Sequence, residues 1–208
     1  MEQIRGNYLL INGKTVEAEA GQSFASTVPF YEVIRVMAGK LLFFEDHYRR
    51  FQNSVSASCL ELPAMEVLRK DLHRLIGLNG FSEGNIKILA YPGDMEVCIT
   101  ESYFIPHSYP DAAQYKTGVV TRSYRFTRPD PSLKQWFGDF RRDVSGFIKN
   151  EGIYEAILSD EQGHLTEGSR SNLFFTDEQD RIITAPAGTV LQGITKTRTE
   201  ELCRQLKL

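Results

Sequence analysis

A proline-flanked polar stretch divides this chain into two patterned halves. Pro106 and Pro110 enclose His107-Ser108-Tyr109 and are followed by Asp111, a composition that is typical of linkers. The 208 residues are enough for one large domain or two small ones. We therefore expect an N-terminal α+β domain over residues 1–108 and a second domain over residues 115–208, joined by a linker at 109–114.

Turn signals predict two hairpins in the first half. Asn12-Gly13, the favoured two-residue hairpin turn, lies between strand-like runs within residues 8–19. Later elements follow from β-branched runs, helical spacing of apolar residues and helix-start signals. They are a strand at 30–36 with a return strand at 41–44, a helix from His47 to about Ser58 with Asp46 as N-cap, a helix from Pro63 to Asn79-Gly80, and strands at 86–91 and 97–104.

The second half also mixes strands and helices. The pattern predicts strands at 118–121, 154–158, 171–175 and 181–184 and helices at 141–150 and 195–208. Hairpins and crossovers in both halves favour an α/β fold made of α+β layers rather than an all-parallel sheet.

Composition excludes several functional classes. The net charge is −3 and the basic residues are scattered, so a nucleic-acid or membrane-surface partner is not expected. No apolar run is long enough to span a bilayer, and the N-terminus has no apolar segment of a secretory signal. The three cysteines are widely spaced and have no histidine at metal-ligand spacing, which indicates reduced thiols in a cytoplasmic protein without a metal site.

Three segments carry the candidate chemistry, whereas nucleotide-loop and serine-hydrolase motifs are missing. The first is the run at 44–51, just after the strand with Tyr31-Glu32. The second is Leu133-Lys134-Gln135. The third combines Glu155-Ala-Ile-Leu, Thr166-Glu-Gly with Asn172, and Gly193-Ile-Thr.

The order of these segments, from Tyr31 to Thr195, resembles the class IV aminotransferases, which are fold type IV pyridoxal-phosphate enzymes. That family includes D-amino-acid and branched-chain aminotransferases and aminodeoxychorismate lyase. The resemblance implies a two-domain fold, pyridoxal 5'-phosphate as cofactor, and a homodimer.

The resemblance assigns Lys134 as the Schiff-base lysine that also shuttles the α-proton. Apolar neighbours at 133, 136 and 137 suit a nucleophilic amine, although composition alone would suggest a surface lysine. Lys87 and Lys149 are rivals. Lys87 lies in a strand with alternating polar and apolar residues, and Lys149 lies in a charged helix, so we expect both to be solvated.

The resemblance also assigns the other cofactor contacts. Glu167 would hold the proton on the ring nitrogen. The amides of Ile194 and Thr195, with the Thr195 hydroxyl, would bind the phosphate at a helix N-terminus, where a capping threonine would look the same. Arg50 would also bind the phosphate. Tyr31 would line the substrate side, or else serve as a core aromatic.

The sequence also departs from the family pattern. The aromatic-Gly-x-Gly run before Tyr31 is replaced by residues 24–30, and the Arg-x-His substrate trap expected near 91–95 is missing. Arg170 occupies a generally small position and is a candidate for the substrate carboxylate, with a solvent-facing side chain as the alternative. Lys196 replaces a frequent arginine. The chain ends in the helix after Thr195, so we expect a shortened second domain.

These observations favour transfer of an amino group between an amino acid and a 2-oxo acid. One alternative is a lyase that releases pyruvate from aminodeoxychorismate, and another is a catalytically idle relative that binds a ligand. Lys134, Glu167 and Gly193-Ile-Thr together argue against the idle relative, whereas the missing carboxylate trap argues for it.

Overall fold

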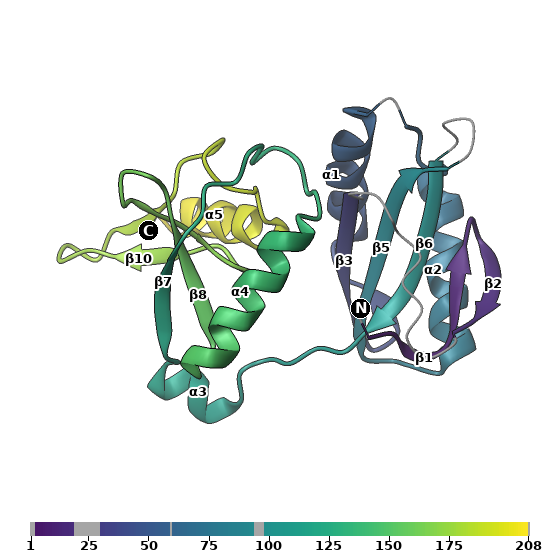
Figure 1. Ribbon diagram of the computed structural model, residues 1–208, viewed down its shortest axis with the longest axis horizontal. Coiled ribbons are helices and arrows are strands. Elements are labelled where there is room, and N and C mark those ends of the chain that lie inside the picture. The colour runs from purple at the N-terminus through teal and green to yellow at the C-terminus, as the bar shows by residue number, and fades with distance from the viewer. Residues whose placement is uncertain (1–2, 19–29, 59, 94–97, 208) are drawn as a thin grey trace. The chain divides into compact units, whose positions relative to one another are not determined.

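The computed structural model describes residues 3–18, 30–58, 60–93 and 98–207, which form two compact units (Figure 1). Unit 1 comprises Met1–Tyr109 and Lys134–Trp136, and unit 2 comprises Pro110–Leu133 and Phe137–Leu208. The division after Tyr109 falls within the expected linker. The short Lys134–Trp136 segment packs with unit 1, whereas the sequence reading assigned it to the second domain.

The described part of unit 1 contains a six-stranded antiparallel sheet with the order β2-β1-β6-β5-β3-β4. Asn12 and Gly13 adopt φ of 48° and 72°, so the predicted first hairpin turn is confirmed, because this turn needs two left-handed residues. The strands are β1 (Arg5–Ile11), β2 (Lys14–Glu17), β3 (Phe30–Met37), β4 (Lys40–Leu41), β5 (Gly84–Pro92) and β6 (Cys98–Ile105).

Two helices, α1 (Phe44–Ser56) and α2 (Met65–Asn79), cover one face of this sheet (Figure 1). Helix α1 begins earlier than expected, since Phe43 is its left-handed N-cap at φ 50°. The predicted strand through Phe44 and the predicted cap at Asp46 were therefore wrong. Asp46 lies instead in the first turn, where a carboxylate interacts favourably with the helix dipole.

Strand alternation gives unit 1 two packed layers. Toward the helices, the core includes Ile34, Ile86 and Phe104, each at most 1% exposed. The opposite face carries a second, more aromatic cluster of Leu9, Tyr31, Leu89, Tyr91 and Tyr103, with Trp136 packed against it. Both faces of β3 and β5 are thus buried, so neighbouring residues on one strand lie in different environments.

Unit 2 pairs β7 with β8 in parallel and β8 with β9 antiparallel, and β10 and β11 form a separate hairpin. Helix α4 packs its Phe140 and Val144 against Ala156 and Leu158 of β8. The elements are α3 (Ala112–Thr117), β7 (Thr121–Arg125), α4 (Gly138–Glu151), β8 (Glu155–Ser159), β9 (Leu165–Gly168), β10 (Phe174–Thr176), β11 (Ile182–Thr184) and α5 (Ile194–Leu206).

Unit 2 differs from the sequence reading at several boundaries. The strands predicted from 118 and from 171 begin only at Thr121 and Phe174. Helix α3 was not expected, although Asp111 and Gln114 form a full capping box, a helix-start signal that the proline-rich context obscured. Among the described residues, none of the helices has the length and apolar character that crossing a membrane requires.

Candidate active site

Lys134 is anchored to two elements of unit 1 through its backbone. Its amide donates to Ser54 Oγ on α1 at 3.1 Å, and its carbonyl accepts from the Tyr31 amide on β3 at 3.0 Å. The Lys134 Nζ atom lies 4.5 Å from the centroid of the Tyr31 ring. Trp136 meets the same ring edge-on at 5.5 Å. Two predicted site residues, Lys134 and Tyr31, are therefore brought together.

Arg50 on α1 and Glu32 on β3 form a buried bidentate ion pair. Arg50 donates from Nε and NH2 to the two carboxylate oxygens at 2.7 and 2.8 Å, and His47 Nδ1 lies 2.7 Å from Oε2. Burial would raise the pKa of Glu32. The Arg50 charge, hydrogen bonds from His47 and Arg50, and the Lys134 charge outweigh burial and lower this pKa to about 2. Glu32 is thus a carboxylate anion, to which His47 Nδ1–H donates.

Sequence reasoning overlooked Glu32 and His47. Glu32 follows Tyr31 on β3 and so projects toward the other face of the sheet, where α1 presents His47 and Arg50 three residues apart. In the sequence, His47 marks only the expected start of a helix, and its contact with Glu32 appears only in the structure. The side chain of Arg49, the neighbour of Arg50 in the sequence, is 67% exposed.

Lys87 is buried rather than solvated, which corrects the sequence expectation. It is 2% exposed, and its Nζ lies 3.7 Å from the Trp136 ring centroid and 5.3 Å from that of Tyr31. Ammonium groups are attracted to aromatic faces at such distances. Lys149 is exposed, as expected. Lys87 therefore remains the rival that any assignment of the reactive lysine must exclude.

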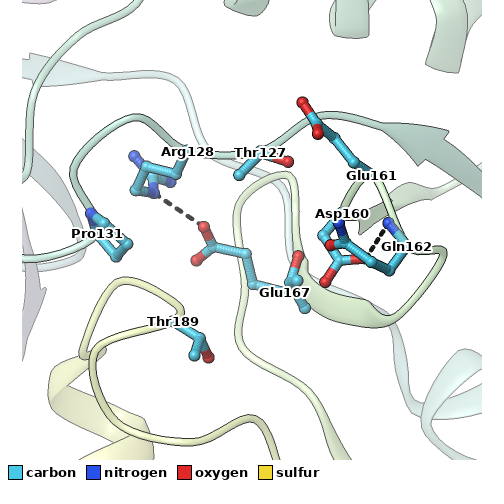
Figure 2. A pocket seen from close by; sticks show the side chains of 9 residues that line it. Thr127, Arg128, Pro131, Asp160, Glu161, Gln162, Glu167 and Thr189 are labelled. Carbon is cyan, nitrogen blue, oxygen red and sulfur yellow. Dashed lines mark hydrogen bonds and ion pairs between the residues drawn. The ribbon is translucent and has the colours of Figure 1, made fainter.

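In unit 2, Glu167 lies on β9 at the wall of a cavity of about 420 Å³. Arg128 donates from Nε to Glu167 Oε1 at 2.9 Å, and both side chains are 6% exposed. Figure 2 shows the carboxylate pointing toward this guanidinium. Arg128 was not predicted, because no local motif marks the partner of a buried carboxylate. The other lining residues are Thr127, Pro131, Asp160, Glu161, Gln162, Thr166 and Thr189.

Two sequence motifs meet at the N-terminus of α5. Asn172 donates from Nδ2 to the Leu191 carbonyl at 2.9 Å, and its Oδ1 abuts Gly193 so closely that a Cβ at 193 would collide with it. Gly193 is the N-cap, and no described side chain caps the helix. The first helical residues, Ile194 and Thr195, therefore present their amides at an end whose dipole favours anions.

Arg170 has contacts other than those predicted. Its NH2 donates to the Tyr154 carbonyl at 2.8 Å, and its Nε lies 3.8 Å from Glu155 Oε2. Arg170 lines a smaller cavity that does not include Glu167. These contacts connect Arg170 to the beginning of β8, and its role in substrate binding stays a prediction. The 24–29 run and residues 94–95 of the expected trap region lie outside the described residues.

Comparison with known proteins supplies the family. The family model for amino-transferase class IV matches residues 29–208. The D-alanine aminotransferase of Bacillus licheniformis is 26% identical over 95% of this chain and 75% of its own length. A "Probable branched-chain-amino-acid aminotransferase" of Rickettsia conorii is 26% identical over 86% of this chain, which spans 65% of that relative.

Solved structures show the same fold. The branched-chain amino acid aminotransferase of Escherichia coli superposes with a TM-score of 0.82 at 18% identity, over 98% of this chain and 76% of that one. The branched-chain aminotransferase of Thermoproteus uzoniensis, in a structure with norvaline, superposes with a TM-score of 0.79 at 20% identity, over 98% of this chain and 76% of that one. The fold and the match over residues 29–208 agree, and the chain belongs to the amino-transferase class IV family.

Proposed function

We propose that this chain is a pyridoxal-phosphate enzyme that transfers an amino group between an amino acid and a 2-oxo acid. The observation that carries the proposal is the placement of Lys134. Its backbone is hydrogen-bonded to β3 and α1, and its amine lies near the face of the Tyr31 ring. Its positive charge is also close enough to the buried Glu32–Arg50 pair to lower the pKa of Glu32. A surface lysine in a loop would need none of these contacts.

The donor set fits the parts of this cofactor. The uncapped N-terminus of α5 suits a phosphate, and Gly193 has no room for a side chain that would cover it. Glu167 is a buried carboxylate at the wall of the unit 2 cavity, and a carboxylate suits a protonated ring nitrogen. Lys134 supplies the amine for the aldehyde. The three chemically distinct parts of the cofactor thus each have a matching group.

The proposed roles follow from these positions. In unit 1, Lys134 holds the cofactor and moves the α-proton at Nζ, Arg50 binds the phosphate, and Tyr31 lines the substrate side. In unit 2, Ile194 and Thr195 bind the phosphate, and Glu167 holds the proton on the ring nitrogen. When bound, the cofactor supplies an electron sink for the carbanion at the substrate α-carbon.

The proposal includes amino acids and 2-oxo acids as the small-molecule partners, a homodimer and a cytoplasmic location. The homodimer and the location are supported by the resemblance to the family and by the three cysteines, respectively. Sedimentation velocity tests the homodimer directly, because a sedimenting species of one chain's mass at micromolar concentration would contradict it.

An amino-donor screen tests the reaction. Protein loaded with pyridoxal phosphate is incubated with individual L- and D-amino acids and a 2-oxo acid, and the new amino acid is measured. Lys134→Ala should abolish turnover, whereas Lys149→Ala, on an exposed helix surface, should keep it. Pyruvate release from aminodeoxychorismate without an amino acceptor would instead establish the lyase. Failure of every donor and of this lyase substrate would leave the idle relative.

A further inference from the structure

The residues around Arg50 and Lys134 close a hydrogen-bonded cycle within unit 1. Glu32 binds the Arg50 guanidinium through both oxygens, and Ser54 Oγ donates to the Arg50 carbonyl at 3.1 Å. The same Ser54 Oγ accepts from the Lys134 amide, and the Lys134 carbonyl accepts from the Tyr31 amide. Because Tyr31 and Glu32 are adjacent on β3, the path returns to its starting point.

The cycle joins three segments that are distant in sequence. Glu32 belongs to β3, and Arg50 and Ser54 lie one turn apart on α1. Lys134 follows Ser54 by 80 residues in the chain. Glu32 and Ser54 are both fully buried, so water does not compete for these bonds. The cycle therefore fixes the distance between the α1 guanidinium and the backbone that carries the lysine amine.

The Glu32 pair also sets the direction of the guanidinium. A guanidinium is planar and has five N–H groups, and this bidentate contact uses the Nε–H and one N–H of NH2. The N–H groups of NH1 and the second one of NH2 lie along the other edges of the plane. With one edge held by a buried carboxylate, the plane cannot rotate without breaking two charge-assisted bonds. His47 fixes the carboxylate from the side.

Stability alone does not explain such a cluster. A buried ion pair is a weak source of stability, because removing both charges from water costs about as much as their attraction returns. An apolar set at positions 32, 47 and 50 would hold α1 on the sheet equally well. A guanidinium with a fixed orientation holds its N–H groups in a defined direction. Such an arrangement allows it to bind two oxygens of a phosphate monoester at once.

We propose that Glu32 and Ser54 are positioning residues: Glu32 orients Arg50 for the cofactor phosphate, and Ser54 sets the Lys134 backbone relative to that guanidinium. The inference rests on the proposed function, which supplies the phosphate-bearing ligand. The two residues act on different parts of that ligand. Glu32 acts mainly on phosphate recognition, through the Arg50 guanidinium, whereas Ser54 acts on the approach of the amine to the aldehyde, through the Lys134 backbone.

Binding of pyridoxal phosphate is compared with that of pyridoxal, which lacks the phosphate. Glu32→Gln should weaken pyridoxal phosphate binding about tenfold, the usual effect of losing a group that orients a ligand-binding side chain. Its affinity for pyridoxal should change less than twofold. Arg50→Ala should show the same selectivity, and adding Glu32→Gln to it should cause no further loss. Glu45→Gln, which affects an exposed pair on the same helix, is the control.

Ser54→Ala is tested by the rate at which either ligand becomes attached to Lys134, followed by its visible absorbance. The rate should fall severalfold for pyridoxal phosphate and pyridoxal alike, while Ser56→Ala, at an exposed position on α1, leaves it unchanged. Equal loss of both ligands in Glu32→Gln, or an unchanged rate in Ser54→Ala, overturns the inference. If Glu32→Gln does not fold, Ser54→Ala decides. Failure of the unmodified chain to attach either ligand at Lys134 would instead refute the proposed function.

Discussion

Removal of the Arg128 guanidinium provides a quantitative test of the buried pair at the unit 2 cavity. The side chains of Arg128 and Glu167 are each 6% exposed, and the distance between Nε and Oε1 is 2.9 Å. Truncating one partner of a buried pair leaves an uncompensated charge and costs about 3–5 kcal/mol. Arg128→Met keeps the volume of the side chain and removes the charge. We expect the free energy of unfolding to fall by about that amount at neutral pH.

An exposed pair in the same unit is the matched control. Arg181 binds Asp177 at 2.7 Å, but its side chain is 72% exposed. Exposed pairs contribute about 0–1 kcal/mol, so Arg181→Met should change the free energy of unfolding by less than 1 kcal/mol. The two ion pairs have similar distances, but their removal should lower the free energy of unfolding by very different amounts, because only one of them is buried.

A double-mutant cycle completes this test. Glu167→Gln alone leaves Arg128 buried beside a neutral amide, whereas the double variant leaves neither charge behind. The double variant should therefore lose clearly less than the sum of the single variants, with a coupling of about 1–3 kcal/mol. Guanidinium chloride unfolding followed by circular dichroism gives the free energies. Additive losses, or a loss for Arg128→Met as small as the control, would refute the reasoning.

Three further predictions test other parts of the account. The lowered pKa of Glu32 means that its stabilisation is complete above its ordinary pKa of 4.5 and is lost as pH falls toward 2. The advantage of the native chain over Glu32→Gln, about 3 kcal/mol at pH 6, should therefore shrink in unfolding experiments at pH 4 and 3; a constant difference would contradict the ion pair. In the loaded enzyme, Glu167→Gln should reduce kcat far more than cofactor affinity, and unchanged turnover would remove Glu167 from the mechanism. Gly193→Ala should lower the thermal midpoint, since its Cβ meets Asn172 and overpacking costs about 1–3 kcal/mol, whereas Gly146→Ala, in open space on α4, should raise it slightly. Equal midpoints for these two alanine variants would refute the close approach at 193.

The elements that local chemistry determines were predictable from the sequence. Asn12-Gly13 specifies its hairpin, because the turn needs two left-handed residues. Gly80 and Gly152 end α2 and α4 in left-handed conformations, as the glycine stop signals indicate. The start of α1 was missed because Phe43 adopts φ 50°, a conformation that an aromatic residue rarely signals.

The parts of the candidate site that depend on distant contacts were not predictable. The bridge between Phe30 and Gln135 places Lys134 with unit 1, and nothing local to residues 134–136 indicates it. Lys87 was expected in solvent because alternation predicts which face a residue occupies, but not what covers that face. Trp136, 49 residues further along the chain, packs over it. Arg128 and Glu167 likewise meet across 39 residues.

Identification of the reactive lysine tests the central claim most directly. Protein mixed with pyridoxal phosphate is reduced with borohydride, digested and analysed by mass spectrometry. Lys87 is the rigorous comparison, because it is buried and its amine, like that of Lys134, lies near the face of the Tyr31 ring. The account predicts a visible absorbance band before reduction and a cofactor-derived mass on Lys134. Label on Lys87 or Lys149, or a protein that stays colourless, would contradict it.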